Sequence, residues 1–221
     1  MNNIEFICED KSIMDHFPIK PANKVIPDWY KDLDKWHSAP GVKLPTVKHC
    51  MPVQDYITSG YIIQNTFEVI LKSNVGKSPE DFAVETHNPE YIGGHYFQQL
   101  PVEFDNKNKN YIKIVQPWII KTPPGYSCLF VQPFYHFEKR FKLFPSIVDT
   151  DKHDMIVNLP GVLLSDKEIT LEPYTPLMQV IPFKRENWEM SMSVEKREKS
   201  LLDFFFRGGY RRLFHKKKTY K

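Results

Sequence analysis

Hydrophobic and polar positions alternate in short runs along this chain, and turn residues separate the runs. The densest example lies between residues 123 and 185, where PPGYSCLFVQP, SIVDTD, a stretch ending EITLEPYTP and LMQVIPFKRE follow one another. Short runs rich in β-branched and aromatic residues, bounded by Pro, Gly and Asp, are typical of strands. We therefore predict four short strands here, in a closed or sandwiched antiparallel β structure.

The same pattern predicts strands outside this segment. Alternation in NIEFIC indicates a first strand, and YIIQNTFEVILKS indicates another that begins at Tyr61. After the polar turn DNKNKN, the run YIKIVQPWIIK supplies a strand on which Ile112, Ile114 and Gln116 share one face. Proline cannot donate to a strand ladder, so Pro117 is expected to break that run.

Two helices are predicted, one on each side of the β-rich region. Pro27 followed by DWYKDL predicts a short helix with Trp29 and Leu33 on one face, and the next stretch, HSAPGVKLPTVKHCMPVQDYITSG, reads as loop and turn. Residues 187–206 predict a C-terminal helix that Gly208 and Gly209 end.

These elements predict a mainly β fold, a compact antiparallel barrel or sandwich of the β-clip or jelly-roll kind. Residues 1–186 would form one β-rich domain, and residues 187–221 a C-terminal helix and a basic aromatic tail. Composition agrees, since 41% of residues are hydrophobic, 14% are aromatic and 18 are proline. A chain of 221 residues is long enough to bury one full core.

The number of cysteines and the hydropathy of the chain indicate in which cellular compartment the protein is expected. The three cysteines, Cys8, Cys50 and Cys128, are an odd number with no close pair, which favours free thiols in a reducing compartment. No apolar run approaches the roughly 18 residues of a membrane-spanning helix, and MNNIEFICED lacks the features of a signal peptide. We expect a soluble protein in a bacterial cytoplasm, with no membrane partner.

Charge is divided unevenly along the chain. Residues 207–221 hold seven Lys or Arg and no acid, so the preceding residues sum to −4 although the whole chain carries +3. Such a tail can bind nucleic acid or an acidic protein surface, or can anchor on the body of its own chain, and its aromatic spacing favours docking. The residues that would act in it are Arg207, Arg211, Arg212, Phe214, Lys216, Lys217 and Lys218.

Histidines offer a metal hypothesis without a metal-binding motif. His87 and His95 are eight residues apart, and neither an HExxH motif nor a paired CxxC motif occurs. A facial triad would have to draw on separated residues, for which the pool is His87, His95, His136, His153 and Asp149. Solvated loop histidines are the alternative, and we expect no cofactor.

Aspartates after the predicted SIV strand form the best candidate chemical cluster. Asp149 and Asp151 alternate, so they would share one face and a field that raises the pKa of one of them, with His153 and Asp154 beside them. Such a carboxylate can activate water. The alternative is an Asp-rich turn whose side chains cap their own backbone. Candidate catalytic residues, if the protein is an enzyme, are therefore Asp149, Asp151 and His153.

Several landmarks in one order resemble a protein family. These are FIC near the start, VIPDWYK, HCMPVQDYITSGY, TPPGYSCLFVQP, VDTD and LMQVIPFKRE. Together they resemble an uncharacterised family of marine tailed bacteriophages and some bacteria. The resemblance implies a phage or bacterial context, either the cytoplasm of an infected or host cell or the virion, and it implies no activity.

Residues 123–185 are also similar, in order and spacing, to the dUTPase family. The matching elements are Pro124-Gly125, Val131-Gln132-Pro133, Val148-Asp149-Thr150-Asp151 and Leu177-Met178-Gln179. The resemblance implies that Asp149 activates water and that Gln179 contacts phosphate, and Tyr126 beside the Gly turn is a further candidate ligand-binding residue.

The chain departs from the dUTPase pattern at the residues that would grip a nucleotide. Lys152 stands where the family has a sugar-stacking Tyr, and Pro176 where it has Arg. Phe134-Tyr135-His136 replaces the phosphate-binding Arg-Ser-Ser, and no Gly-rich C-terminal lid is visible. Without these donors little transition-state stabilisation remains, so the similarity implies a β-clip fold more than an enzyme.

The leading hypothesis is a non-enzymatic bacteriophage protein, a virion-associated structural or assembly module that binds protein neighbours, including itself as a homo-oligomer. One alternative is a nucleotide-binding protein or hydrolase with a pocket near Asp149, His153 and Gln179. An iron-dependent oxygenase on a β scaffold is another. Binding of nucleic acid through residues 207–221 is a further possibility.

Overall fold

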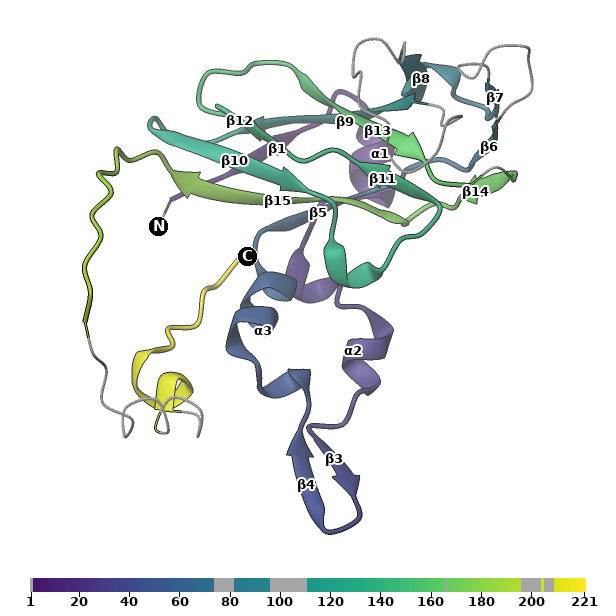
Figure 1. Ribbon diagram of the computed structural model, residues 1–221. Helices are drawn as coiled ribbons and strands as arrows, with labels where there is room; N and C mark the ends of the chain where they lie inside the picture. The colour runs from purple at the N-terminus through teal and green to yellow at the C-terminus, as the bar shows by residue number, and fades with distance from the viewer. Residues whose placement is uncertain (1, 74–81, 96–110, 166, 196–203, 205–208) are drawn as a thin grey trace.

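Two antiparallel sheets lie face to face and share one hydrophobic core (Figure 1). The computed structural model describes residues 2–73, 82–95, 111–165, 167–195, 204 and 209–221. Strands outweigh helices in these residues, and every strand pair among them is antiparallel. The predicted mainly β fold with antiparallel sheets is therefore confirmed.

The first sheet is built around the long strand β9. Its order is β1-β9-β13-β11, and β8 pairs with the same edge of β9 as β1 does, farther toward the start of β9. The strands are β1 (Glu5–Ile7), β8 (Ile92–His95), β9 (Tyr111–Lys121), β11 (Phe141–Leu143) and β13 (Ile156–Leu163).

The second sheet has the order β12-β10-β15-β5-β2. Its strands are β2 (Lys20–Pro21), β5 (Tyr61–Gln64), β10 (Tyr126–Val131), β12 (Ser146–Val148) and β15 (Pro176–Lys184). In the described part of residues 123–185 there are thus six strands, counting β14, where the sequence predicted four. The three-residue strand β11 was missed because so short a strand holds too few residues to show a period. The stretch ending EITLEPYTP was predicted as one strand, whereas the chain forms β13 and a separate strand β14 (Ile169–Leu171) there.

Two smaller sheets complete the strands. One has the order β14-β6-β7 and is formed by β6 (Val69–Ser73), β7 (Phe82–Glu85) and β14 (Ile169–Leu171), and the other is the hairpin β3 (Trp36–Ala39) and β4 (Val42–Pro45). The two large sheets have open ends among the described strands. Of the two predicted architectures the described strands form a sandwich and do not close into a barrel.

The core lies between the two sheets. Ile112 and Leu159 of the first sheet and Phe130 and Leu177 of the second are at most 1% exposed and belong to one cluster. Burying a large aliphatic or aromatic side chain stabilises a fold by about 1.5–3 kcal/mol relative to leaving it in water. Closure of this one sandwich is therefore the main source of stability.

Strand β9 runs through Pro117, against the prediction that it ends there. Register shifts between Ile156 and Asn158 of β13 opposite this part of β9, and Gln116 supplies the hydrogen bonds that the irregular ladder loses. Its Nε2 donates to Trp118 O at 2.7 Å and to Val157 O at 3.1 Å, and its Oε1 accepts from Trp118 N at 2.7 Å. The side-chain amide thus keeps the strand continuous at its proline.

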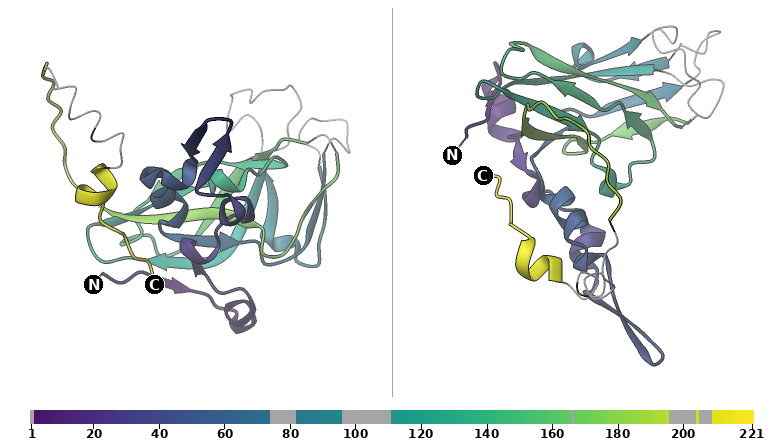
Figure 2. Two further views of the ribbon diagram at one scale, coloured as in Figure 1. Left: turned by 90° about the horizontal axis from the view of Figure 1, so that it is seen from below. Right: turned by 60° about the vertical axis from the view of Figure 1, so that its left-hand side comes forward.

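Short helices and single turns connect several of the strands. They are α1 (Lys11–His16), α2 (Asp28–Asp32) and α3 (Met51–Thr58), with single turns η1 (Ala22–Lys24), η2 (Val47–His49), η3 (Pro89–Tyr91) and η5 (Phe134–His136). The helix predicted after Pro27 is confirmed, with Pro27 as its N-cap. The following stretch was predicted as loop but holds hairpin β3–β4 and helix α3, which project from the sheets in Figures 1 and 2.

The predicted C-terminal helix is wrong over residues 187–195, which form no regular element and leave the end of β15 as an extended segment. Most of residues 196–208 lie outside the described residues. Gly209 is the N-cap of the short π-helical turn η6 (Tyr210–Phe214). None of the described helices combines the length and apolar character needed to span a bilayer.

Candidate functional site

Asp149 and Asp151 follow β12 and lie beside one guanidinium, that of Arg185 at the end of β15. Arg185 Nη1 donates to Asp151 Oδ1 at 2.8 Å, and its Nη2 donates to Asp151 Oδ2. The same Nη1 lies 3.2 Å from Asp149 Oδ1. The two carboxylates therefore share one side of the turn, as their alternation predicted, but a cation stands between them.

Further donors hold both carboxylates in place. Gly125 N donates to Asp151 Oδ2 at 2.8 Å, and Ser127 Oγ donates to Asp149 Oδ1 at 2.7 Å. Gly125 has a φ of +85°, the left-handed conformation that turns its N–H toward the aspartate. Arg185 Nη1 also donates to Tyr126 O at 2.9 Å. The cluster thus joins three segments: the turn before β10, the turn after β12 and the end of β15.

The sequence predicted a raised pKa for one of the two aspartates, whereas the pKa of Asp151 is lowered. The Arg185 guanidinium and the Gly125 N–H lower the pKa of Asp151 to about 2, so the carboxylate remains ionised. Asp151 is also nearly covered, with 5% of its side chain exposed, whereas Asp149 keeps 54% exposed. Arg185 and Asp151 therefore form a fixed ion pair between the end of β15 and the turn after β12.

The other candidates near this turn also form structural contacts. His153 N donates to Asp149 O at 2.9 Å and closes the turn, and Asp154 forms an ion pair with Lys121. The Tyr126 hydroxyl accepts a hydrogen bond from Asn2 Nδ2.

Gln179, the predicted phosphate contact, lies in the core of β15 with 1% of its surface exposed. Its Nε2 donates to Tyr56 O at 2.7 Å and to Ser59 O at 2.6 Å. These two carbonyls lie at the C-terminal end of helix α3, where Tyr56 O also accepts from Ser59 N at 3.2 Å. Gln179 therefore fastens α3 to the second sheet, and the sequence contained no signal for that role.

Histidines are not gathered into a metal site in the part of the chain that the structure describes, where no three His, Cys, Asp or Glu residues are placed to hold an ion. His87 is exposed on the segment after β7, and His95 ends β8 opposite Tyr111. His136 is partly buried, and burial lowers its pKa.

The three cysteines are free thiols. Cys128 lies in the core, where burial raises the pKa of its thiol to about 11. A thiol with that pKa stays protonated and acts as a small packing residue.

The basic tail docks on the body of its own chain. His215 Nε2 lies 2.9 Å from Asp55 Oδ1, and Lys218 Nζ pairs with the other oxygen of Asp55. Burial would raise the pKa of Asp55, but the hydrogen bonds from Lys218 and His215 outweigh burial and lower it. The Tyr220 ring packs edge-on against Tyr61 at 5.9 Å between ring centroids.

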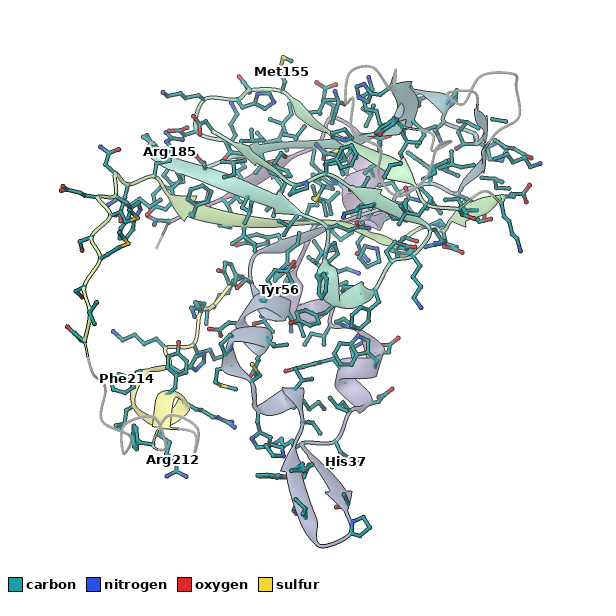
Figure 3. The ribbon with its side chains drawn as sticks, in the orientation of Figure 1. His37, Tyr56, Met155, Arg185, Arg212 and Phe214 are labelled. Atoms are coloured by element: carbon teal, nitrogen blue, oxygen red, sulfur yellow. The ribbon has the colours of Figure 1, made fainter. Side chains whose placement is uncertain are left out.

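This docking leaves the other cations of the tail in solvent. Arg211, Arg212, Lys216 and Lys217 are exposed, and Figure 3 shows Arg212 and Phe214 away from the sheets. Arg207 lies outside the described residues.

An aromatic cluster forms where η5 meets the two helices below the second sheet. Phe134, Tyr135 and Phe137 pack against one another, with ring centroids 5.2–6.2 Å apart, Trp29 of α2 lies 5.4 Å from Phe137, and Tyr56 of α3 lies 5.6 Å from Tyr135. Trp29 Nε1 donates to Tyr135 O at 2.7 Å and fixes the turn. Phe134 and Phe137 nevertheless remain 65% and 50% exposed.

Beside this cluster lies an open groove with a volume of about 460 Å³, which we call the aromatic groove. Apolar side chains line most of it, and Lys139 and Lys142 stand at its rim. The apolar lining comes chiefly from Val131, Phe134, Phe137, Leu143, Pro145 and Leu164. Concave apolar surfaces with a few polar groups at the rim are the usual form of binding sites.

Residues 187–195, which we call the arm, carry the most exposed large apolar side chains among the described residues. Trp188, Met190, Met192 and Val194 are 87%, 82%, 87% and 102% exposed, and polar residues occupy the positions between them. This period of two would place all four side chains on one face of a strand. The signal was present in the letters WEMSMSVE, but the spacing of Trp188 and Met192 also fits a helix, which was the interpretation chosen.

The aromatic groove was not predicted either, although its signal was visible in the run PFYHF directly after a strand. Density of aromatics does not reveal whether rings are buried or exposed. Here Phe137 adopts a left-handed backbone with φ of +52°, which turns the chain back toward β11 and leaves two rings at the surface.

Comparison with known proteins adds little to this geometry. No protein-family model and no curated protein sequence matches the chain. Among solved structures, the native dUTPase of EIAV is similar at 12% sequence identity and a TM-score of 0.31, over 59% of this chain and 99% of that chain. The dUTPase similarity expected from the sequence thus has a weak structural counterpart, and at this TM-score it carries no argument about activity.

Proposed function

We propose that this protein is a non-enzymatic assembly module that attaches to protein neighbours through its arm. The observation that carries the proposal is the row of four apolar side chains at alternate positions of residues 187–195, each at least 82% exposed. Burial of each such side chain at an interface would contribute about 1.5–3 kcal/mol before the cost of ordering the arm. Exposed apolar surface of this extent is typical of interaction sites.

The surroundings of the candidate catalytic residues support the non-enzymatic part of the proposal. Arg185 contacts both Asp149 and Asp151, and the side-chain amide of Gln179 donates hydrogen bonds to the end of α3. Each of these side chains thus has a structural partner that a substrate would have to displace. A nucleotide hydrolase at this turn would need Arg185 to move, because its guanidinium lies against both carboxylates.

A phage particle is the assembly that the sequence resemblance implies, and we propose it as the context of the module. In that setting the neighbours would be other proteins of the virion or of an assembly intermediate. The direct check is immunoblotting of purified particles with an antibody against this chain, normalised to a major particle protein.

The arm itself is tested with paired variants of the full-length chain. Met190→Ser/Met192→Ser removes two side chains from the apolar face, and Ser191→Asn/Ser193→Asn alters the opposite face as a matched control. Both pairs are exposed, so thermal unfolding should be unchanged. In extracts of the cell that makes the protein naturally, we expect the wild type and the Ser191 and Ser193 control in a large complex by gel filtration, and the Met190 and Met192 variant outside it.

Elution of all three proteins at the 26.2 kDa mass of one chain would contradict the proposed function. So would a complex that retains the methionine variant fully.

Polyanion binding by the tail is a second candidate, favoured by the exposure of Arg211, Arg212, Lys216 and Lys217 on a segment whose end is docked. Binding to single-stranded oligonucleotides should then fall steeply between 50 and 200 mM salt, as expected for about four phosphate contacts. Substitution of these four cations by Gln should abolish it, and an unchanged affinity would contradict it.

A further inference from the structure

We infer that the arm of one copy of this chain occupies the aromatic groove of a second copy. The inference rests on the proposed function, and it names the partner and the receiving surface. Both complementary parts are present on one chain, so a symmetric pair can exchange arms and cover both apolar surfaces at once.

Strand register places the arm and the groove at opposite ends of one strand pair. Tyr126 pairs with Lys184 and Val131 pairs with Gln179, so the arm starts beside the beginning of β10. The groove begins at Val131, at the other end of β10, about 17 Å away at the usual rise per residue. In Figure 1 the arm descends on the side of the molecule opposite β11, and Figure 3 shows Arg185 on that side, apart from Tyr56 of the groove.

Hydrogen bonds and ion pairs within the same chain hold the wall of the aromatic groove in place. Glu138 accepts hydrogen bonds from the backbone and the guanidinium of Arg140 at 2.8–2.9 Å, and Arg140 also pairs with Glu172 at 2.8 Å. Together with the bond from Trp29 to Tyr135, these fix both ends of the loop that carries Phe134 and Phe137. A preformed wall reduces the ordering cost that binding must overcome.

Gln132 decides how the arm would bind. Its Oε1 accepts from Leu143 N at 3.1 Å and its Nε2 donates to Phe141 O at 3.4 Å, so the side-chain amide occupies the outer edge of β11. Addition of the arm as a further strand on β11 is therefore blocked. The groove is open to side chains instead, and Trp188 and the methionines are of the size and polarity to enter it.

Charge distinguishes the aromatic groove from the other large cleft. That cleft, of about 920 Å³, is lined by Glu9, Asp10, Glu90 and Asp154 with one lysine, Lys11. Residues 187–195 contain two glutamates and no cation, and they would be repelled there. The aromatic groove is lined by Lys139, Lys142 and one carboxylate, Glu138, which is already paired with Arg140, so its lining suits an acidic apolar segment.

Sedimentation of the purified full-length protein tests the inference. We expect a reversible dimer or closed ring, and Trp188→Ser and Phe134→Ser should each raise its dissociation constant about tenfold or more. Ile147→Ser is the matched control, because Ile147 on β12 is 64% exposed against 65% for Phe134 but does not line the groove. All three positions are exposed, so the fold should survive.

Cysteine cross-linking locates the contact. In a Cys50→Ser background, which removes the exposed thiol, chains with Lys139→Cys in the groove lining are mixed with chains that carry Met190→Cys or Met192→Cys. Under mild oxidation we expect mixed disulfide dimers from at least one of these positions, and none from Ser191→Cys on the opposite face of the arm.

The outcomes separate the inference from the proposed function. A wild type that is monomeric at every concentration overturns the inference, as does a dimer that Trp188→Ser weakens but Phe134→Ser leaves intact. In both cases the proposed function stands if the methionine variant still leaves the native complex. Cross-linking of arm to arm alone would also overturn the inference.

Discussion

Arg185 forms a two-point ion pair with Asp151, in which Nη1 donates to Oδ1 and Nη2 donates to Oδ2. Because the residues are 34 positions apart, the pair ties the end of β15 to the turn after β12. It also sets where the arm begins, since the arm starts two residues after Arg185. The contact is therefore a structural boundary between the sandwich and the segment proposed to bind a neighbour.

Replacement of Asp151 by Asn should destabilise the fold in a pH-dependent manner. The pKa of Asp151 is about 2 in the folded state, below its ordinary value, so ionisation contributes stability at neutral pH. That contribution is lost as the pH falls from about 4 to 2. Thermal unfolding should show a lower midpoint for Asp151→Asn at pH 7, and a difference from wild type that narrows toward pH 2.

Asp149→Asn is the matched control for this prediction, because Asp149 is 54% exposed and has the longer contact, 3.2 Å, with Arg185. Asp149→Asn should lower the thermal unfolding midpoint less than Asp151→Asn does. An equal effect of the two variants at pH 7 would contradict the asymmetry seen in the structure.

Gln179→Leu should lower the free energy of unfolding by about 1–3 kcal/mol, because the carbonyls of Tyr56 and Ser59 lose a buried donor. Urea unfolding followed by circular dichroism measures the change. Gln64→Leu is the control, since Gln64 donates only at the surface, to Tyr174 O at 2.7 Å, and should cost less. If Gln179 served a ligand and not the fold, its replacement would leave the unfolding curve unchanged.

Gly60→Ala should be among the most destabilising single substitutions in the chain. Gly60 has a φ of +68°, and a Cβ there would lie 2.0 Å from Val180 O, so β5 could not keep its register with β15. We expect a loss of at least about 3 kcal/mol or failure to fold.

Gly41→Ala separates the steric effect from the backbone effect. Gly41 has a similar φ, +74°, but an added Cβ meets nothing within 4 Å, so only the left-handed backbone cost of about 1–2 kcal/mol applies. Comparable unfolding energies for the two variants would rule out the close approach at Gly60.

Asp55→Asn should loosen the tail, because Asp55 pairs with both His215 and Lys218. Surface pairs contribute about 0–1 kcal/mol, so we expect tryptic cleavage within the tail to accelerate about two- to fivefold. The pKa of Asp55 is lowered in the folded state, so its contacts with His215 and Lys218 should also weaken as the pH falls through that lowered value. Asp28→Asn, on α2 away from the tail, should leave the cleavage rate unchanged.

Local pattern was sufficient for the features that depend on neighbours in sequence. Alternation of apolar residues predicted β9, β10 and β15, Pro27 predicted the start of α2, and aromatic spacing in the tail favoured the docking that Asp55 and Tyr61 provide. The free state of the cysteines also followed from their number. Each of these rests on residues whose conformational preference or chemistry is largely independent of distant partners.

Tertiary structure alone decided what each polar candidate does. The sequence placed Asp149 and Asp151 on one face, but only the fold brings Arg185 between them, and only the fold turns Gln179 toward α3 and Gln116 into the irregular ladder of β9. The arm was ambiguous for a related reason, since a row with apolar residues at 188 and 192 fits a helix as well as a strand. Whether a side chain is buried, paired or left in solvent depends on distant segments, and no local period contains that information.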